Sequence, residues 1–214
     1  RHPFRRPDPL RLHHRDLARV VGHQAQSQKP ETAQQGGPDA EIPDLQLVFV
    51  QAIVDDHGRR PHWGHGISCH VTLLRPKSRG TVTLETADAS DAPRIDTAFF
   101  SDPDDMRVLL KGADLQRRIL DGQAFDEVRG KALYALDQSD PRAVEQDIRD
   151  RADTQYHPVG TCKMGPPQDS MAVVDEQLRV RHMHGLRVID ASIMPTMLSA
   201  NLNAATMMIA AKAA

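Results

Sequence analysis

The sequence has few aromatic residues and no excess of charge of either sign. Aromatic side chains make up 4% of the 214 residues, and 27 basic residues stand against 29 acidic ones. Proteins that bind nucleic acid usually combine a basic surface with rings that stack on bases. We therefore expect no nucleic-acid partner.

Long apolar segments and cysteines are also scarce. The longest apolar run near the C-terminus, residues 204–214, is too short to span a bilayer, and no signal-peptide core is visible. The two cysteines, Cys69 and Cys162, could form at most one disulfide and match no disulfide scaffold. We expect a reducing compartment and therefore a cytoplasmic protein, with association to a membrane surface left open.

A glycine-rich phosphate-binding turn is missing as well. Dinucleotide-binding folds hold the pyrophosphate at a GxGxxG turn between a strand and a helix. Residues 36–38 read Gly-Gly-Pro, and residues 64–66 lack both the third glycine and a following helical pattern. The chain also opens with Arg1 and stops at Ala214 within a helical pattern, so we expect the C-terminal part of a longer protein.

The pattern divides the chain into three stretches: residues 1–44, 45–152 and 153–214. The first stretch has the composition of a divergent or disordered segment. In the second, three runs have the alternation or β-branched content of strands. These runs are residues 45–50, 68–74 and 80–85. We expect the last two to pair through the turn at residues 75–79 in an antiparallel sheet with one covered face.

Two helices should follow these strands. Asp102-Pro103 and Asp140-Pro141 each place an N-cap residue before a proline at the first helical position. Apolar residues then recur at helical spacing, as from Met106 to Leu120. Strands followed by helices, without βαβ alternation, indicate an α+β fold in which helices flank an antiparallel sheet. In the third stretch we expect short buried strands at residues 172–174 and 186–190.

Three motifs stand in the last stretch. Residues 156–165 read Tyr-His-Pro-Val-Gly-Thr-Cys-Lys-Met-Gly, and residues 190–195 read Asp-Ala-Ser-Ile-Met-Pro. Asn201-Leu202-Asn203 then begins an Ala/Met-rich helix. In this order and spacing, they resemble the C-terminal end of the glucose–methanol–choline (GMC) family of FAD-dependent alcohol oxidoreductases.

The resemblance implies a fold and an activity. Residues 45–152 would form the family's α+β substrate-binding domain, and residues 153–214 would return to the FAD domain, whose glycine-rich part is absent from this sequence. The cofactor would be FAD, and the substrate a small primary alcohol oxidised to its aldehyde. The motif looks closer to the aliphatic-alcohol branch than to the choline branch. The electron acceptor, oxygen or quinone, stays open.

Catalytic roles follow from the same resemblance. Alcohol oxidation needs a base at the hydroxyl, and imidazole titrates near neutral pH. His157 would take the proton, and Asn201 would hold the oxygen. The residues that would face the flavin are Asp190, Ala191, Asn203, Ala204 and Thr206. Two simpler roles remain open: either asparagine could cap the last helix, and Asp190 could cap the turn after it.

Two other functions compete with this one. The chain could be a truncated, non-catalytic fragment that does not hold FAD alone. It could also be a His/Cys metal-binding module built on His62, His65, Cys69 and His70. Their spacing matches no paired-ligand pattern, and alternation along a strand sends Cys69 and His70 to opposite faces, so we expect no zinc or other metal.

Overall fold

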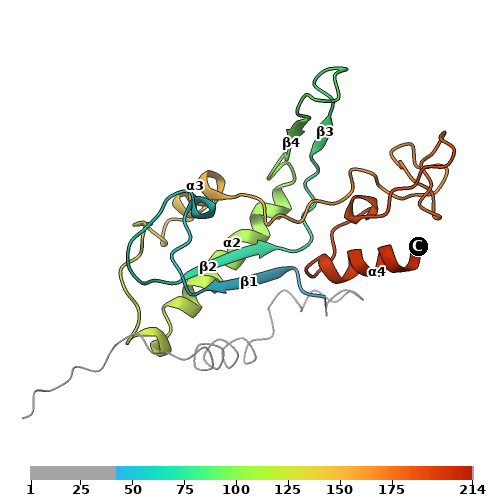
Figure 1. Ribbon diagram of the computed structural model, residues 1–214. Helices are drawn as coiled ribbons and strands as arrows, with labels where there is room; N and C mark the ends of the chain where they lie inside the picture. The colour runs from blue at the N-terminus through green and yellow to red at the C-terminus, as the bar shows by residue number, and fades with distance from the viewer. Residues whose placement is uncertain (1–41, 214) are drawn as a thin grey trace, which may run out of the picture. The chain divides into compact units, whose positions relative to one another are not determined.

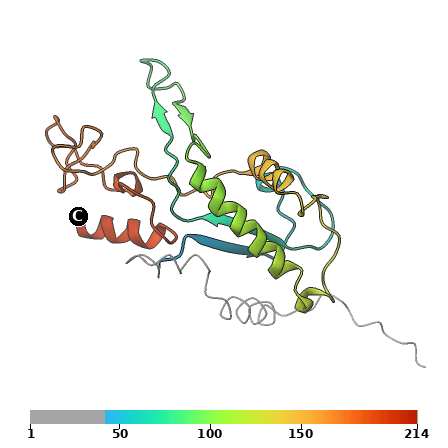
Figure 2. The ribbon, with the colours of Figure 1, turned by 180° about the vertical axis from the view of Figure 1, so that it is seen from behind.

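The computed structural model describes residues 42–213 (Figures 1 and 2). The stretch predicted at residues 1–44 therefore lies almost wholly outside the described residues. The chain folds into two compact units. The described part of the first unit comprises residues 42, 47–71 and 110–147, and the second comprises residues 43–46, 72–109 and 148–214, described to 213. No helix in the described part of the chain is long and apolar enough to cross a membrane.

Strands β1 (Leu45–Val50) and β2 (Ser68–Leu73) form where the apolar runs predicted strands, and they pair with each other in a two-stranded sheet. The N–H of Leu74 donates to the carbonyl of Asp44 over 2.9 Å, which joins the start of β1 to the end of β2, as in an antiparallel pair. Helix α2 (Pro103–Leu120) lies along one face of this sheet in both views. The Gln116 side chain on α2 donates to the carbonyl of Cys69 in β2.

Strand β3 (Thr81–Thr83) pairs with β4 (Arg94–Asp96), not with β2. The expected hairpin between residues 68–74 and 80–85 is therefore wrong. Its covered face is wrong too, because Val82, Leu84 and Ile95 are 50%, 84% and 65% exposed. Alternation predicts which side chains share a face, but it does not say whether another element packs on that face.

Both predicted helix starts are confirmed. The Asp102 carboxylate accepts the N–H of Asp104 over 2.9 Å at the start of α2. The Asp140 carboxylate accepts the N–H of Arg142 over 2.9 Å at the start of α3 (Pro141–Arg151). An aspartate at the N-cap thus satisfies an N–H that has no partner inside the helix.

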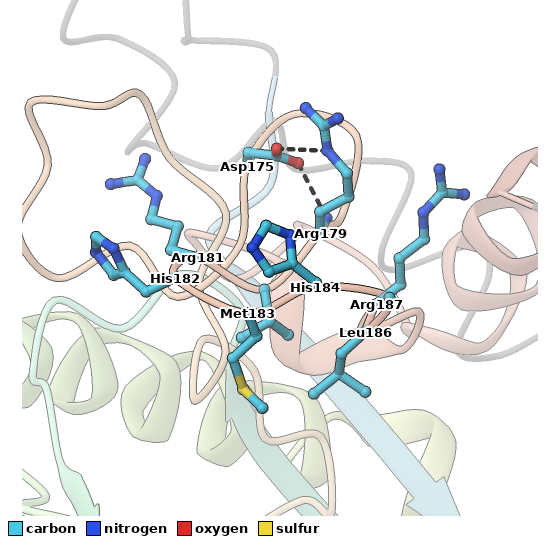
Figure 3. A pocket seen from close by; sticks show the side chains of 10 residues that line it. Asp175, Arg179, Arg181, His182, Met183, His184, Leu186 and Arg187 are labelled. Atoms are coloured by element: carbon cyan, nitrogen blue, oxygen red, sulfur yellow. Dashed lines mark hydrogen bonds and ion pairs between the residues drawn. The ribbon is translucent and has the colours of Figure 1, made fainter.

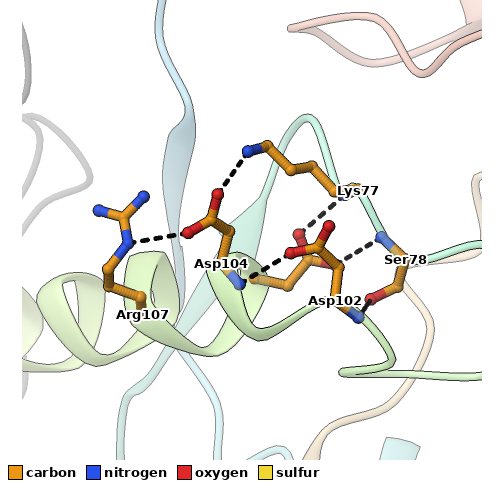
Figure 4. A network of polar contacts seen from close by, with 6 residues as sticks. Lys77, Ser78, Asp102, Asp104 and Arg107 are labelled. Atoms are coloured by element: carbon orange, nitrogen blue, oxygen red, sulfur yellow. Dashed lines mark hydrogen bonds and ion pairs between the residues drawn. The ribbon is translucent and has the colours of Figure 1, made fainter.

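A buried carboxylate explains why residues 75–79 do not form a hairpin turn. Asp105 in the first turn of α2 is 4% exposed and accepts the N–H of Lys77 over 2.8 Å and the N–H of Ser78 over 2.9 Å. Figure 4 labels these two donor residues and Asp102. The Ser78 hydroxyl in turn accepts the N–H of Asp102 over 3.1 Å. These bonds direct the chain after β2 to the helix N-terminus, where a negative charge is also favourable.

Asp105→Ala should destabilise the fold by about 2–4 kcal/mol, because it leaves two partly buried N–H groups without an acceptor. Urea unfolding followed by circular dichroism measures this. The matched control is Asp104→Ala, since Asp104 is more exposed and its ion pairs with Lys77 and Arg107 lie at the surface. Equal losses in the two variants would show that the buried acceptor has no special role.

In the first unit, one carboxylate joins three segments of the chain. Asp55 accepts hydrogen bonds from the Tyr134 hydroxyl and from Nε2 of His62, each over 2.7 Å. These two bonds, Tyr134 first, lower the pKa of Asp55 below its ordinary value. The contribution of these bonds to stability is therefore fully present when the pH is above the ordinary pKa of an aspartate. It is lost as the pH falls through the lowered pKa of Asp55.

The buried core lies mostly in the second unit. Val174 is fully buried, at the centre of isolated bridges to Met164 and Val180. The strands expected at residues 172–174 and 186–190 are reduced to these single bridges and one between Arg179 and Arg187. Other buried apolar residues of this unit are Leu74, Met106, Ala172, Ile193, Met194 and Leu202.

Candidate active site

The segment that carries His157 follows α3 and forms neither a helix nor a strand. Tyr156 has φ of +62°, and its N–H donates to the Thr154 hydroxyl over 2.9 Å. The Tyr156 ring is 66% exposed, whereas His157 is half-buried. The backbone on both sides of His157 is therefore restricted, by the hydrogen bond at Tyr156 and by the ring of Pro158.

The structure brings the first two motifs together. The N–H of Cys162 donates to the carbonyl of Ser192 over 3.0 Å, and the N–H of Met164 to the carbonyl of Ile193 over 2.8 Å. Gly160 has φ of +86°, and a Cβ at this position would lie 3.5 Å from the carbonyl of Met194. The left-handed backbone there suits glycine. Segments 156–165 and 190–195 thus form one hydrogen-bonded element, which their sequence separation does not reveal.

Asp190 caps the short helix η4 (Ala191–Ile193) that follows it. Its carboxylate accepts the N–H of Ser192 over 2.8 Å and also the hydroxyl of that residue. This is the simpler of the two roles considered for Asp190. The cap also fixes Ala191 at the start of η4. Ile193, the last residue of η4, and Met194, which follows it, are buried at 3% and 5% exposure.

Helix α4 (Asn203–Ala213) begins where the sequence indicated. Leu202, 4% exposed, precedes it, and its carbonyl accepts both the N–H and the hydroxyl of Thr206, each over 2.9 Å. The helix-capping role left open for Asn201 or Asn203 is therefore not what the structure shows. Burial of Leu202 fixes the point where the chain enters the helix, so Leu202 takes the N-cap position and Asn203 becomes the first helical residue.

The two asparagines flanking Leu202 are exposed, as is Ala204. Within residues 42–213, neither amide makes a hydrogen bond to the protein, and none joins His157 to Asn201. The Thr206 hydroxyl donates within α4 and keeps only its acceptor capacity. All seven predicted site residues lie in the second unit, and the amides and the imidazole are free to receive a ligand.

The methionines of this unit lie in different environments. Met194 is 5% exposed and lies in the core, but Met207 and Met208 on α4 are 59% and 61% exposed. None of the described residues of α4 is buried, although the helix is rich in apolar side chains.

Sequence reasoning missed Arg181. Its guanidinium donates to the carbonyls of Gly165 over 2.7 Å and Pro166 over 2.6 Å, with longer bonds to Pro167 and Asp169. An ion pair of 2.7 Å between Lys163 and Asp169 closes the same loop, and it lowers the pKa of Asp169. This arginine thereby holds the end of the His157 motif. Only the Leu-Arg-Val-Arg alternation of residues 178–181 could have drawn attention to it.

The His/Cys segment gives no support to a metal-binding module. Burial raises the pKa of the Cys69 thiol to about 11. Burial also lowers the pKa of His70. No group of three or more His, Cys, Asp or Glu side chains that could hold a metal ion occurs in the described part of the chain.

Comparison with protein families identifies the chain. Residues 76–210, which contain all three motifs, match the model of the GMC oxidoreductase C-terminal region. The chain belongs to the GMC oxidoreductase family. Among curated relatives, the alcohol dehydrogenase [acceptor] of Pseudomonas putida is 41% identical over 183 residues, covering 83% of this chain and 32% of that protein. The mitochondrial choline dehydrogenase of Homo sapiens is 43% identical over 182 residues, covering 83% and 30%.

Solved structures agree with this assignment. Pyridoxine 4-oxidase from Mesorbium loti aligns with a TM-score of 0.70 at 28% identity, over 80% of this chain and 33% of that one. A formate oxidase from Aspergillus oryzae, described for the modification of its FAD, aligns with a TM-score of 0.73 at 25% identity, over 90% and 33%. The α+β fold expected from the sequence is confirmed. The chain spans about a third of the length of the relatives it matches.

Proposed function

We propose that this chain is the substrate-binding and catalytic C-terminal portion of an FAD-dependent enzyme that oxidises the CH–OH group of a primary alcohol to the aldehyde. The observation that carries the proposal is the joining of the His157 segment to the Asp190 turn by two backbone hydrogen bonds. The proposal is also supported by the fact that His157 and the start of α4, with its two free amides, belong to the same compact unit.

The residues present fit a flavin. The first N–H groups of α4 have no partner inside the helix, and a helix N-terminus carries partial positive charge. Asn203 and Ala204 are exposed there, and alanine leaves room for a flat ring to approach the backbone. We propose that these two, with Asp190, Ala191 and Thr206, hold the FAD. When bound, the flavin supplies the hydride acceptor.

The chain's own residues then handle the hydroxyl group. The His157 imidazole accepts the proton of the alcohol O–H, and the Asn201 amide donates a hydrogen bond to the oxygen as negative charge develops on it. The carbinol carbon loses hydride, so the alcohol loses two electrons and two hydrogens in total and becomes an aldehyde. Holding the base on a fixed turn keeps it close to the proton it must take.

The relatives support an alcohol as the substrate class. The names of two curated relatives specify an alcohol dehydrogenase and a choline dehydrogenase, and choline is itself an alcohol. Their identities to this chain, 41% and 43%, do not favour one branch over the other. The names of the curated relatives include both an acceptor-dependent alcohol dehydrogenase and an oxygen-dependent choline dehydrogenase, the latter from Cronobacter sakazakii.

We propose a cytoplasmic location for the protein and leave association with a membrane open.

The complete protein should purify yellow, and its flavin should lose absorbance when a primary alcohol is added without oxygen. The 214-residue chain alone should retain little or no FAD after desalting, because it lacks a pyrophosphate-binding turn. Flavin absorbance measures both results.

A tertiary alcohol is the control ligand, because its carbinol carbon has no hydrogen to leave as hydride. Bleaching by a tertiary alcohol would contradict direct oxidation of the CH–OH group. A stoichiometric flavin on the chain alone would reveal a cofactor site of different construction. Flavin in the complete protein that no alcohol reduces would favour the second candidate, a portion without catalytic function.

A further inference from the structure

A hollow at the hairpin of residues 175–187 gathers cationic side chains (Figure 3). It has a volume of about 590 Å³, opens to solvent and is lined by ten residues. The lining residues that carry positive charge are Arg179, Arg181 and Arg187, and His182 and His184 lie beside them. Asp175 is the carboxylate among the lining residues. Neither His157 nor Asn201 lines this hollow, so it is not the alcohol site proposed above.

The backbone of the hairpin holds two arginines directly opposite each other. Arg179 and Arg187 form an isolated antiparallel bridge, with the N–H of Val180 bonded to the carbonyl of Leu186 over 3.0 Å. Cross-strand partners lie on the same face of a ribbon, and like charges in such a pair are destabilising. Figure 3 shows both guanidinium groups extending to the same side. The fold therefore maintains a repulsive pair at the hollow.

The neighbouring groups offset only part of this charge. Nε of Arg179 lies 2.8 Å from the Asp175 carboxylate, and its Nη2 donates to Gln177 over 2.8 Å. The backbone N–H of Arg179, and then its side chain, lower the pKa of Asp175. Arg181 is already bonded to four carbonyls. Within the described residues, the Arg187 side chain has neither an ion pair nor a hydrogen bond.

The two histidines add donors at the same hollow. His182 and His184 are exposed on the turn, with φ of +60° at His182 and +74° at Gly185 setting its shape. In Figure 3 the His184 ring lies beside the Arg179 side chain, on the side away from Arg187. Each imidazole ring carries an N–H that can donate a hydrogen bond.

We propose that this hollow binds a phosphate group, as the dianion of a phosphate monoester, through Arg187 and the outer nitrogen of Arg179, with His184 as a further N–H donor at the wall of the hollow. A guanidinium presents parallel N–H donors that match two phosphate oxygens. Two negative charges placed between Arg179 and Arg187 would convert a repulsion into two attractions. A monocarboxylate brings only one negative charge and should bind more weakly.

Inorganic phosphate is the probe, added to the 214-residue chain at constant ionic strength and pH. The imidazole C–H proton resonances of His184, assigned with a His184→Gln variant, should shift and saturate with phosphate but not with sodium chloride. Acetate should give a weaker response. Arg187→Gln should weaken phosphate binding by about tenfold or more, the range for a lost hydrogen bond to a charged group.

Arg94→Gln is the matched control, since Arg94 is an exposed strand arginine that faces Thr83 in its own ribbon. It removes the same charge and should leave phosphate binding unchanged. Because Arg187 has no described partner, its replacement should leave the circular dichroism spectrum unchanged; if it does not, His184→Gln, followed through the resonances of His182, provides the second test. Shifts that never saturate, or equal weakening in the Arg94 and Arg187 variants, would overturn the proposal.

Discussion

Replacing His157 by alanine in the complete protein should slow alcohol oxidation by about 10²–10⁴-fold while flavin content stays unchanged. This is the range for the loss of a positioned acid–base group. The proton of the hydroxyl then leaves to water, and the developing charge on the oxygen has no local base. Stopped-flow measurement of flavin reduction by a primary alcohol, without oxygen, isolates the affected step.

His65→Ala serves as the matched control, because His65 is exposed on a loop of the other unit. It should reduce its flavin at the unmodified rate. The pH profile adds a second readout, since loss of the base should remove a dependence on pH from the reduction rate. An unchanged rate in the His157 variant would assign this residue to the loop structure alone.

Asn201→Ala should slow flavin reduction by about 10²-fold, and by more than Asn203→Ala does. The amide of Asn201 is proposed to meet the oxygen as charge develops, and donors at such positions contribute about this much. Asn203→Ala should instead lower flavin retention. It should not lower thermal stability, because Leu202 holds the N-cap position and alanine favours the helix interior.

Flavin retention, melting temperature and reduction rate, measured on both variants, separate these effects. A loss of reduction in the Asn203 variant with normal reduction in the Asn201 variant would exchange the two roles. A large drop in melting temperature for Asn203→Ala would restore a capping function to its side chain. Ser199→Ala, on the segment before α4, controls for general disturbance near the helix start.

Local signals in the sequence were sufficient for the beginnings of the helices. Asp102-Pro103 and Asp140-Pro141 each contain the whole cause of a helix start, because the capping carboxylate and the N–H it bonds are two residues apart. The apolar run at residues 45–50 likewise became β1 without change. Such elements are determined by neighbours along the chain, and their prediction needs no knowledge of what packs on them.

Partners distant in sequence could not be predicted in this way. The buried Asp105 carboxylate bonds residues 77 and 78, and this diverts the chain from the hairpin that alternation indicated. The exposure of Val82, Met207 and Met208 could not be predicted either. Spacing shows which side chains share a face of an element, but it does not show whether another element packs on that face. Arg181 belongs to the same class, because four carbonyls converge on it only after folding.

The sequence by itself determined the family, the identity of the candidate base and amides, and the start of α4, because these depend on residue types at short spacing. The tertiary structure alone decided that the His157 segment hydrogen-bonds to the Asp190 turn, that Leu202 rather than an asparagine stands at the N-cap, and that Arg179 and Arg187 face each other. Each of these depends on a hydrogen bond or a burial between positions that only the folded chain brings into contact.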